Sequence, residues 1–212
     1  MLTGGTRTFA WDFDNRLDTV TASSGSAIMA YDYTGIRVKK TGSTGSTIYP
    51  FSGYQIEPDG VITKYLRIGT ENIAAKKSTG EKLFYHNDHL GGVNIVTSDL
   101  GIMAQIIEYD PWGKVSREEG IGDSLRRFTG KQLDPESGLY YYGGRYYDPE
   151  LGRFISPDPF VVWFDDPQNL NRYSYVENNP VNYIDPDGFA RKKKKGGFWK
   201  KLLGFIAGAV VG

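Results

Sequence analysis

The 212-residue sequence contains no cysteine. This absence excludes a disulfide framework, a cysteine-ligated zinc or iron–sulfur centre, and a thiol nucleophile. Residues 1–10 also lack the basic and apolar regions of a secretory signal peptide. Because the chain opens inside a repeated pattern, we expect its natural N-terminus to lie upstream, so these residues do not decide whether the protein is exported.

Aromatic residues and turn formers dominate the composition instead. The chain has 15 Tyr, 11 Phe and 4 Trp together with 27 Gly and 10 Pro, a combination that favours strands and hairpins. Six of the prolines follow an aspartate, and a residue before proline is pushed out of the helical region. We therefore predict an all-β fold, in which at most a short helix fits, near residues 169–176.

One motif recurs along the chain: an aromatic residue, an aspartate, two further residues, and then glycine or asparagine. Aspartate suits the first turn position because its side chain bonds the backbone two residues on, and Gly or Asn tolerates positive φ near the end. Each unit is predicted to end one strand and begin the next, which gives a meander of hairpins. The copies are Trp11–Leu17, Tyr31–Arg37, Tyr109–Val115 and, one residue longer, Tyr147–Arg153.

The charges divide the chain into two parts. The tail of residues 190–212 holds seven of the 25 basic residues and none of the 25 acidic ones, so a body of formal charge −7 precedes a tail of +7. From Phe198 the apolar residues recur at helical spacing, which predicts a short amphipathic helix.

Two interpretations of this tail are open. Gly204, Gly208 and Gly212 form a ladder of small residues like those at packed membrane helices, and a basic amphipathic helix suits an anionic membrane surface. Only 11 residues follow Lys201, whereas a membrane span needs about 20. The alternative is a solvated linker to a missing C-terminal domain, and we expect truncation because the sequence stops inside the helical pattern.

Three long motifs carry a resemblance to a known family. They are YHNDHLGG at 85–92, RRFTGKQLDPESGLYYYGGRYYDPELGRFISPDPF at 126–160 and NLNRYSYVENNPVNYIDPDG at 169–188. These motifs resemble the RHS repeat-associated core of bacterial RHS proteins, of the C components of insecticidal Tc toxins and of wall-associated polymorphic toxins. The resemblance is specific over residues 80–189, and the YD-repeat units are degenerate over 1–79.

The resemblance implies a β-sheet that spirals into a hollow shell, with the repeat-associated core turning inward as a plug and a toxin domain following inside the cavity. Stacking and winding of hairpins would protect their apolar faces and edges. The predicted division is a YD-repeat shell segment over 1–125, a plug over 126–189 and the tail over 190–212. The implied partners are the remaining shell repeats and a C-terminal toxin domain absent from this chain, and no nucleic acid is expected to bind the shell.

The resemblance also implies a self-cleaving site. In family members that cut themselves, an arginine and two aspartates resemble an aspartyl protease and release the toxin after a terminal Asp-Pro-x-Gly-Leu motif. The matching residues are Arg145 in GGRYYDP, Asp158 in SPDP and Asp185 in IDPDG. One carboxylate would hold a proton as general acid while the other activates water, without metal or cofactor. The implied cut lies between Phe189 and Ala190.

From their spacing alone, the default interpretation of the two aspartates is structural. Asp158 and Asp185 fit as turn-forming Asp–Pro pairs like the other four, and only geometry separates the two interpretations. The sequence also departs from the family pattern. The terminal motif ends in Phe189 where the family has leucine, the first motif lacks a glycine at Val161, and 27 positions separate the aspartates.

The remaining candidates favour structural roles. His86 and His89 lack an evident third metal ligand, and their DHLGG context fits a β-turn. The tyrosines at 140–142 and 146–147 are better explained by core packing and cross-strand pairing than by stacking on sugars or bases.

We therefore predict a shell and plug segment that encloses a C-terminal effector, with self-cleavage as its one enzymatic activity, in a longer secreted or envelope-associated protein of bacterial competition. A rival hypothesis is a module that binds a cell-surface protein or glycan, which predicts an exposed aromatic pocket away from the aspartates. The other rival is an inert remnant, which predicts that Arg145, Asp158 and Asp185 lie far apart.

Overall fold

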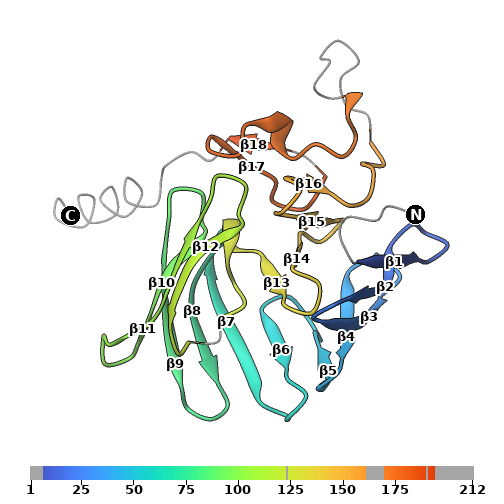
Figure 1. Ribbon diagram of the computed structural model, residues 1–212. Helices are drawn as coiled ribbons and strands as arrows, with labels where there is room; N and C mark the ends of the chain where they lie inside the picture. Colours follow the sequence, from blue (N-terminus) through green and yellow to red (C-terminus); the bar gives the residue numbers. More distant parts are fainter. Residues whose placement is uncertain (1–6, 123, 161–169, 190, 194–212) are drawn as a thin grey trace, which may run out of the picture.

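Strands and turns make up most of the chain, as the all-β prediction requires (Figure 1). The computed structural model describes residues 7–122, 124–160, 170–189 and 191–193. Twelve strands form one antiparallel sheet in which every strand pairs with its neighbours in sequence, so the predicted hairpin meander is confirmed. The strands are β1 (Thr8–Trp11), β2 (Leu17–Ala22), β3 (Gly25–Tyr31), β4 (Arg37–Gly42), β5 (Gly45–Ile48), β6 (Tyr54–Ile56), β7 (Ile62–Ile68), β8 (Glu71–Lys77), β9 (Lys82–Asn87), β10 (Val93–Ser98), β11 (Met103–Tyr109) and β12 (Val115–Gly120).

The recurring aspartate motif forms a hydrogen-bonded turn. After β3, Asp32 donates its backbone N–H to the carbonyl of Ile36 at 2.9 Å, and its Oδ1 accepts from the N–H groups of Thr34 and Ile36 at 2.9 and 3.0 Å. Gly35 has a φ of +85°, a region that glycine enters without steric cost. The same bonds recur at Asp12 and Asp110, as the repeat predicts, and at Asp88.

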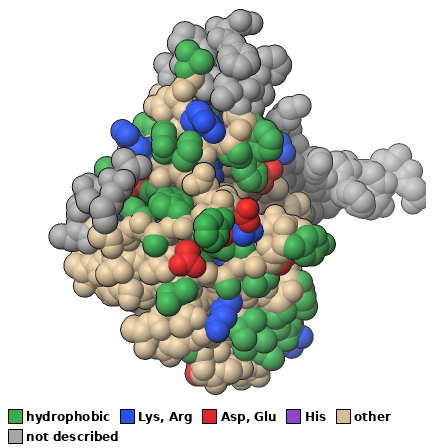
Figure 2. Space-filling model, turned by 90° about the vertical axis from the view of Figure 1, so that its right-hand side faces the viewer, with side chains coloured by type: hydrophobic (Ala, Val, Ile, Leu, Met, Phe, Trp, Pro, Cys, Tyr) green, Lys and Arg blue, Asp and Glu red, His purple; other side chains and the backbone are tan. Residues whose placement is uncertain are grey.

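The two faces of the large sheet differ because side chains alternate along each strand. In β3, Ala27 and Met29 are buried while Ser26 and Ile28 are exposed. Figure 2 shows the side of the molecule formed by β1–β5, where exposed hydrophobic side chains occur in several patches among charged ones. The opposite, buried face supplies the surface on which the rest of the chain packs.

A second antiparallel sheet follows the 3-10 element η1 (Phe128–Gly130) and lies between the β1–β5 and β7–β12 arms of the curved large sheet (Figure 1). Leu139 and Tyr146 share a buried cluster with Val20, whereas Tyr140 belongs to a cluster against which Tyr109 packs. The predicted boundary at 125–126 falls between the last strand of the large sheet and the first strand of the small sheet. The division of the chain into separate units at this boundary stays a prediction. The strands of this small sheet are β13 (Gln132–Asp134), β14 (Leu139–Tyr141), β15 (Tyr146–Asp148) and β16 (Arg153–Phe154).

At most a short helix was expected near 169–176. The described residues, 170–176, contain no α-helix: Leu170 and Val176 have 3-10 conformation, and turns, a bridge and a bend lie between them. The backbone N–H of Phe154 donates to the carbonyl of Tyr173 at 2.9 Å, and Ser174 bridges to Arg153. This contact with the edge strand β16 accompanies a turn in place of an α-helix, and the 3-10 element η3 (Val176–Asn178) follows.

The start of the basic tail pairs with the body. β17 (Tyr183–Ile184) and β18 (Lys192–Lys193) form a separate antiparallel pair, and Nε of Arg191 lies 2.6 Å from Oε1 of Glu177. The predicted amphipathic helix of the tail falls on residues outside the described part of the chain. Within the described part, no helix has the length and apolarity needed to cross a membrane.

Candidate functional site

Arg145, Asp158 and Asp185 lie together beside the start of β15. Nη2 of Arg145 is 2.8 Å from Oδ2 of Asp158 and 3.5 Å from Oδ2 of Asp185. The side chains of Arg145 and Asp185 are 4% and 3% exposed, and that of Asp158 is 14% exposed. The arrangement is therefore a mostly buried cluster in which one guanidinium group binds two carboxylates, opposite to what the inert-remnant hypothesis predicts.

The Arg145 guanidinium also holds two backbone segments. Its Nε donates to the carbonyl of Gly188 and its Nη1 to the carbonyl of Arg172 at 3.0 Å, while its Cζ lies 3.7 Å from the centre of the Phe154 ring. Burial lowers the pKa of Arg145 from its usual value, and the charges of the two aspartates oppose this shift. A guanidinium group stays protonated in proteins, so the cluster contains a fixed cation.

The loop after β16 presents Asp158. Its backbone N–H donates to the carbonyl of Arg172 at 2.8 Å, and Nε of Arg172 donates to the carbonyl of Asp158 at 2.6 Å. Oδ1 of Asp158 accepts the N–H of Phe160 at 2.9 Å, which leaves Oδ2 directed at Arg145. The carboxylate of Asp158 therefore both closes a turn and pairs with Arg145.

The turn after β17 presents Asp185. Its Oδ1 accepts the backbone N–H groups of Gly188 at 2.8 Å and of Phe189 at 3.2 Å. Gly188 has a φ of +86°, and its carbonyl is the one that Arg145 binds. The carboxylate therefore shapes the backbone that leads directly into the predicted cleavage position.

The two sides of the predicted scissile bond are both attached to the body. Phe189 is half-buried and follows the Asp185 turn, and residues 191–193 include the paired strand β18. Ala190 itself lies outside the described residues. A peptide bond held from both sides approaches a nucleophile in a restricted set of geometries.

Lys131 was not anticipated from the sequence. Its Nζ donates to the carbonyl of Pro186 and lies 4.9 Å from the centre of the Tyr142 ring. Burial lowers the pKa of Lys131 to about 8, and the charge of Asp185 opposes this shift. Nothing in the FTGK motif signalled this contact, because Lys131 and Pro186 are brought together only by tertiary packing.

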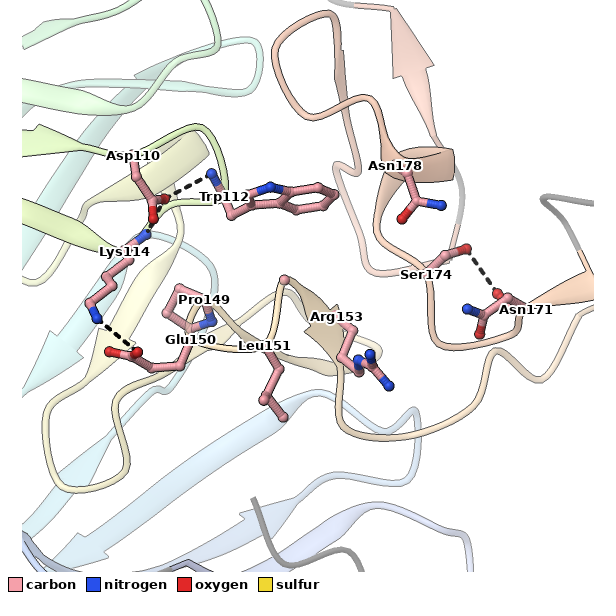
Figure 3. A pocket seen from close by; sticks show the side chains of 11 residues that line it. Asp110, Trp112, Lys114, Pro149, Glu150, Leu151, Arg153, Asn171, Ser174 and Asn178 are labelled. Atoms are coloured by element: carbon pink, nitrogen blue, oxygen red, sulfur yellow. Dashed lines mark hydrogen bonds and ion pairs between the residues drawn. The ribbon is translucent and has the colours of Figure 1, made fainter. Parts of the chain in front are cut away.

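A separate polar pocket of about 520 Å³ lies where the β11–β12 turn, the β15–β16 turn and the segment 171–178 meet. Figure 3 shows the indole of Trp112 extending into it, with Asn171, Ser174 and Asn178 on the facing wall. Nζ of Lys114 lies 2.9 Å from Oε2 of Glu150 at its other side. None of Arg145, Asp158 and Asp185 lines this pocket.

The two histidines make separate contacts. Nε2 of His86 is 3.1 Å from Oγ1 of Thr97, and Nε2 of His89 is 3.0 Å from the carbonyl oxygen of Val181. Asp88, between them in sequence, closes the turn through the N–H groups of Leu90 and Gly92. Among the residues described, no group of three or more His, Asp or Glu side chains is arranged to hold a metal ion.

The clustered tyrosines pack as core residues. Tyr140 and Tyr147 are fully buried, and their hydroxyl groups donate to the carbonyls of Gly113 and Trp112 at 3.0 and 2.7 Å. Burial raises the pKa of Tyr140 above its usual value. These side chains join the small sheet to the β11–β12 turn of the large sheet.

Several known proteins are similar to this chain in sequence or in fold. Over 197 residues the chain is 34% identical to the tRNA3(Ser)-specific nuclease WapA of Bacillus spizizenii, a match that covers 87% of this chain and 8% of that protein. Over 105 residues it is 38% identical to toxin protein Tse5 of Pseudomonas aeruginosa, covering 50% of this chain and 8% of that protein. The chain thus spans less than a tenth of the length of these two relatives.

The crystal structure of TcdB2-TccC3 has the same fold over 87% of this chain and 10% of its own, with a TM-score of 0.74 and 21% identity. Residues 59–181 match the family described as Teneurin YD-shell, which is more than half of the sequence. The match includes the YHNDHLGG motif and most of the repeat-associated core. The chain therefore belongs to the YD-shell family, the shell of RHS and YD-repeat proteins that its motifs predict.

Proposed function

We propose that this YD-shell segment closes a protein container around a C-terminal effector and releases that effector by cutting its own chain. The small sheet between the arms of the large sheet is the proposed plug, and the Arg145–Asp158–Asp185 cluster is the proposed cutting centre. The observation that carries the proposal is that Arg145 binds both carboxylates and also the carbonyl of Gly188. Gly188 directly precedes Phe189, the residue on the amino side of the predicted cut. Two relatives are named as a nuclease and a toxin, and these names support an effector with toxin activity.

The proposed reaction is hydrolysis of the bond between Phe189 and Ala190. One aspartate of the pair, as a carboxylate, takes a proton from water as the water oxygen bonds to the Phe189 carbonyl carbon. The other, in its protonated form, gives that proton to the Ala190 nitrogen as the carbon–nitrogen bond breaks. The products are a carboxyl group on Phe189 and an amine on Ala190. Arg145 holds the two side chains in place and stabilises whichever is charged.

Intact mass during cell-free synthesis tests this reaction, because the fraction of cut chain can be followed from the moment the protein is made. The wild-type chain is expected to break after Phe189. Asp158→Asn and Asp185→Asn are each expected to slow the cut by about 100-fold or more.

Asp110→Asn is the matched control for this experiment. Asp110 is also the first residue of an Asp–Pro turn, but it bonds Trp112 and Lys114 and has no part in the cluster. This variant should be cut at the wild-type rate. A wild-type chain that stays intact, or equal cutting in the Asp158 variant, would refute the proposed cutting centre and leave the segment as a wall of the container.

The Trp112 pocket favours a second candidate function, binding of a glycan at a cell surface. An indole face with amide and hydroxyl groups opposite offers both an apolar contact and hydrogen bonds to sugar hydroxyls. On an oligosaccharide array, binding that is lost in Trp112→Ala and retained in Trp11→Ala would support this role. The absence of binding by the wild-type chain would remove it.

The remaining proposals concern the location of the protein and its tail. We propose that the segment belongs to a secreted or envelope-associated protein. We also propose that residues 190–212 contact anionic lipid, because this part of the sequence is basic and apolar. Flotation of a peptide of residues 190–212 with liposomes tests the contact. Equal flotation with neutral and anionic liposomes, or none with either, would argue against it.

A further inference from the structure

The side chain of Phe189 occupies the space that a side chain on Gly144 would need. A Cβ atom on Gly144 would lie 2.1 Å from Cζ and 2.6 Å from Cε1 of the Phe189 ring, far inside van der Waals contact. The φ of Gly144 lies outside the left-handed region, so backbone conformation does not require glycine here. Room for the Phe189 ring therefore accounts for a glycine at this position.

Phe160 forms the second contact of the Phe189 ring. The two ring centres are 5.9 Å apart with an interplanar angle of 74°, the edge-to-face geometry that aromatic pairs favour. Phe160 lies two residues after Asp158, whose Oδ1 accepts its backbone N–H. The ring contact and the Asp158 carboxylate are thus supplied by the same loop.

The backbone around Phe189 is fixed by the turn that joins β14 to β15. The N–H of Tyr142 donates to the carbonyl of Arg145 at 3.0 Å and closes the turn. The N–H of Gly144 then donates to the carbonyl of Asp187 at 2.9 Å. One turn therefore supplies the cation of the cluster, the open space at Gly144 and a hydrogen bond to the segment that ends in Phe189.

We propose that Gly144 and Phe160 form a specificity seat, which selects a large apolar side chain on the amino side of the cleaved bond and holds its carbonyl near the aspartates. This inference rests on the proposed self-cleavage and names its specificity-determining residues. Anchoring the ring restricts the carbonyl carbon of Phe189 to a small region next to the cluster, which converts binding of the side chain into rate. Neither Gly144 nor Phe160 takes part in the proton transfers.

A double-mutant cycle in the full chain tests the seat, with the fraction of cut chain measured by intact mass during cell-free synthesis. Gly144→Ala and Phe189→Ala are each expected to slow the cut by about tenfold or more. The double variant should be no slower than Phe189→Ala alone, because the new methyl group excludes nothing once the ring is gone. Gly42→Ala is the control, since the atoms nearest to a Cβ there belong to the flexible side chain of Glu136.

Substitutions at 189 provide an independent measurement if Gly144→Ala does not fold, which thermal unfolding in an Asp158→Asn background would show. The rate should fall in the order Phe, Leu, Ala, Lys at this position. A flat series, additive effects in the cycle or wild-type cutting by Gly144→Ala would overturn the seat while leaving self-cleavage intact. A wild-type chain that is never cut would overturn both proposals.

Discussion

Arg37 in β4 and Asp134 in β13 form an ion pair buried between the two sheets, although 97 residues separate them in sequence. Their side chains are 1% and 0% exposed, and Nζ of Lys40 approaches the second oxygen of Asp134 at 3.3 Å. The Arg37 guanidinium also lies over the ring of Tyr141, with its Cζ 4.3 Å from the ring centre. This group of residues fixes the small sheet against the large one.

We expect Asp134→Asn to lower the free energy of unfolding by about 3–5 kcal/mol, because it leaves the buried charges of Arg37 and Lys40 without their shared carboxylate. Urea denaturation of the variant and the wild-type chain measures the difference. Asp99→Asn is the matched control, since Asp99 pairs with Lys82 at 3.6 Å where both side chains are 49% exposed. A loss below about 1 kcal/mol is expected there. Equal effects at the two sites would contradict the buried-pair interpretation.

Arg145→Lys should slow self-cleavage by about 100-fold, although it keeps the charge. A lysine ammonium group cannot reproduce the planar set of bonds to the carbonyls of Gly188 and Arg172 together with the two carboxylates. The cut fraction over time measures the effect. Arg153→Lys, at an exposed position on β16, should leave the rate unchanged, and comparable loss in both variants would point to general destabilisation.

Lys131 should make stability depend on pH in the alkaline range. Burial lowers its folded-state pKa to about 8, below the usual value of 10.5, so between these values the unfolded chain binds a proton that the folded chain has released. Stability attributable to Lys131 therefore rises with pH across this window. We expect the unfolding free energy of the wild type to rise relative to that of Lys131→Met from neutral pH to just below the usual tyrosine pKa of 10.0. Parallel curves for the two proteins would show that Lys131 is not the titrating group.

Phe128→Ala should cost about 3–5 kcal/mol of unfolding free energy. The ring of Phe128 is buried, and its centre lies 5.9–6.3 Å from those of Tyr109, Tyr140, Tyr147 and Tyr175. Thermal or urea unfolding measures the loss. Phe13→Ala removes a fully exposed ring and should change stability by less than about 0.5 kcal/mol. A small loss at Phe128 would mean that the cluster repacks around the cavity.

The local part of the fold was predictable because its causes are local. The aspartate turns at Asp12, Asp32 and Asp110 close through bonds spanning four residues, so the spacing of aspartate and the following glycine or asparagine is enough to predict them. The sequence allowed at most a short helix near 169–176 but could not give the conformation of this segment, because Ser174 pairs with Arg153, a contact that depends on the position of another strand.

The candidate site was predictable only through the family motifs. Arg145, Asp158 and Asp185 could be selected by resemblance, while spacing alone left Asp158 and Asp185 equivalent to the other Asp–Pro pairs. The contacts of Lys131 with Pro186 and of Gly144 with Phe189 join segments about fifty residues apart. No periodicity or turn rule connects such positions, since packing of the small sheet alone brings them together.

The nearest-neighbour order of the large sheet also sets a sequence of assembly. Each of its strands pairs with the strand synthesised just before it, so the large sheet can form progressively while the chain is being synthesised. The small sheet needs partners such as Val20 and Arg37 that are already in place, and Asp185 and Phe189 are added after it. The proposed cutting centre is thus completed after the strands of the large sheet, so that the proposed cut would follow the formation of that sheet.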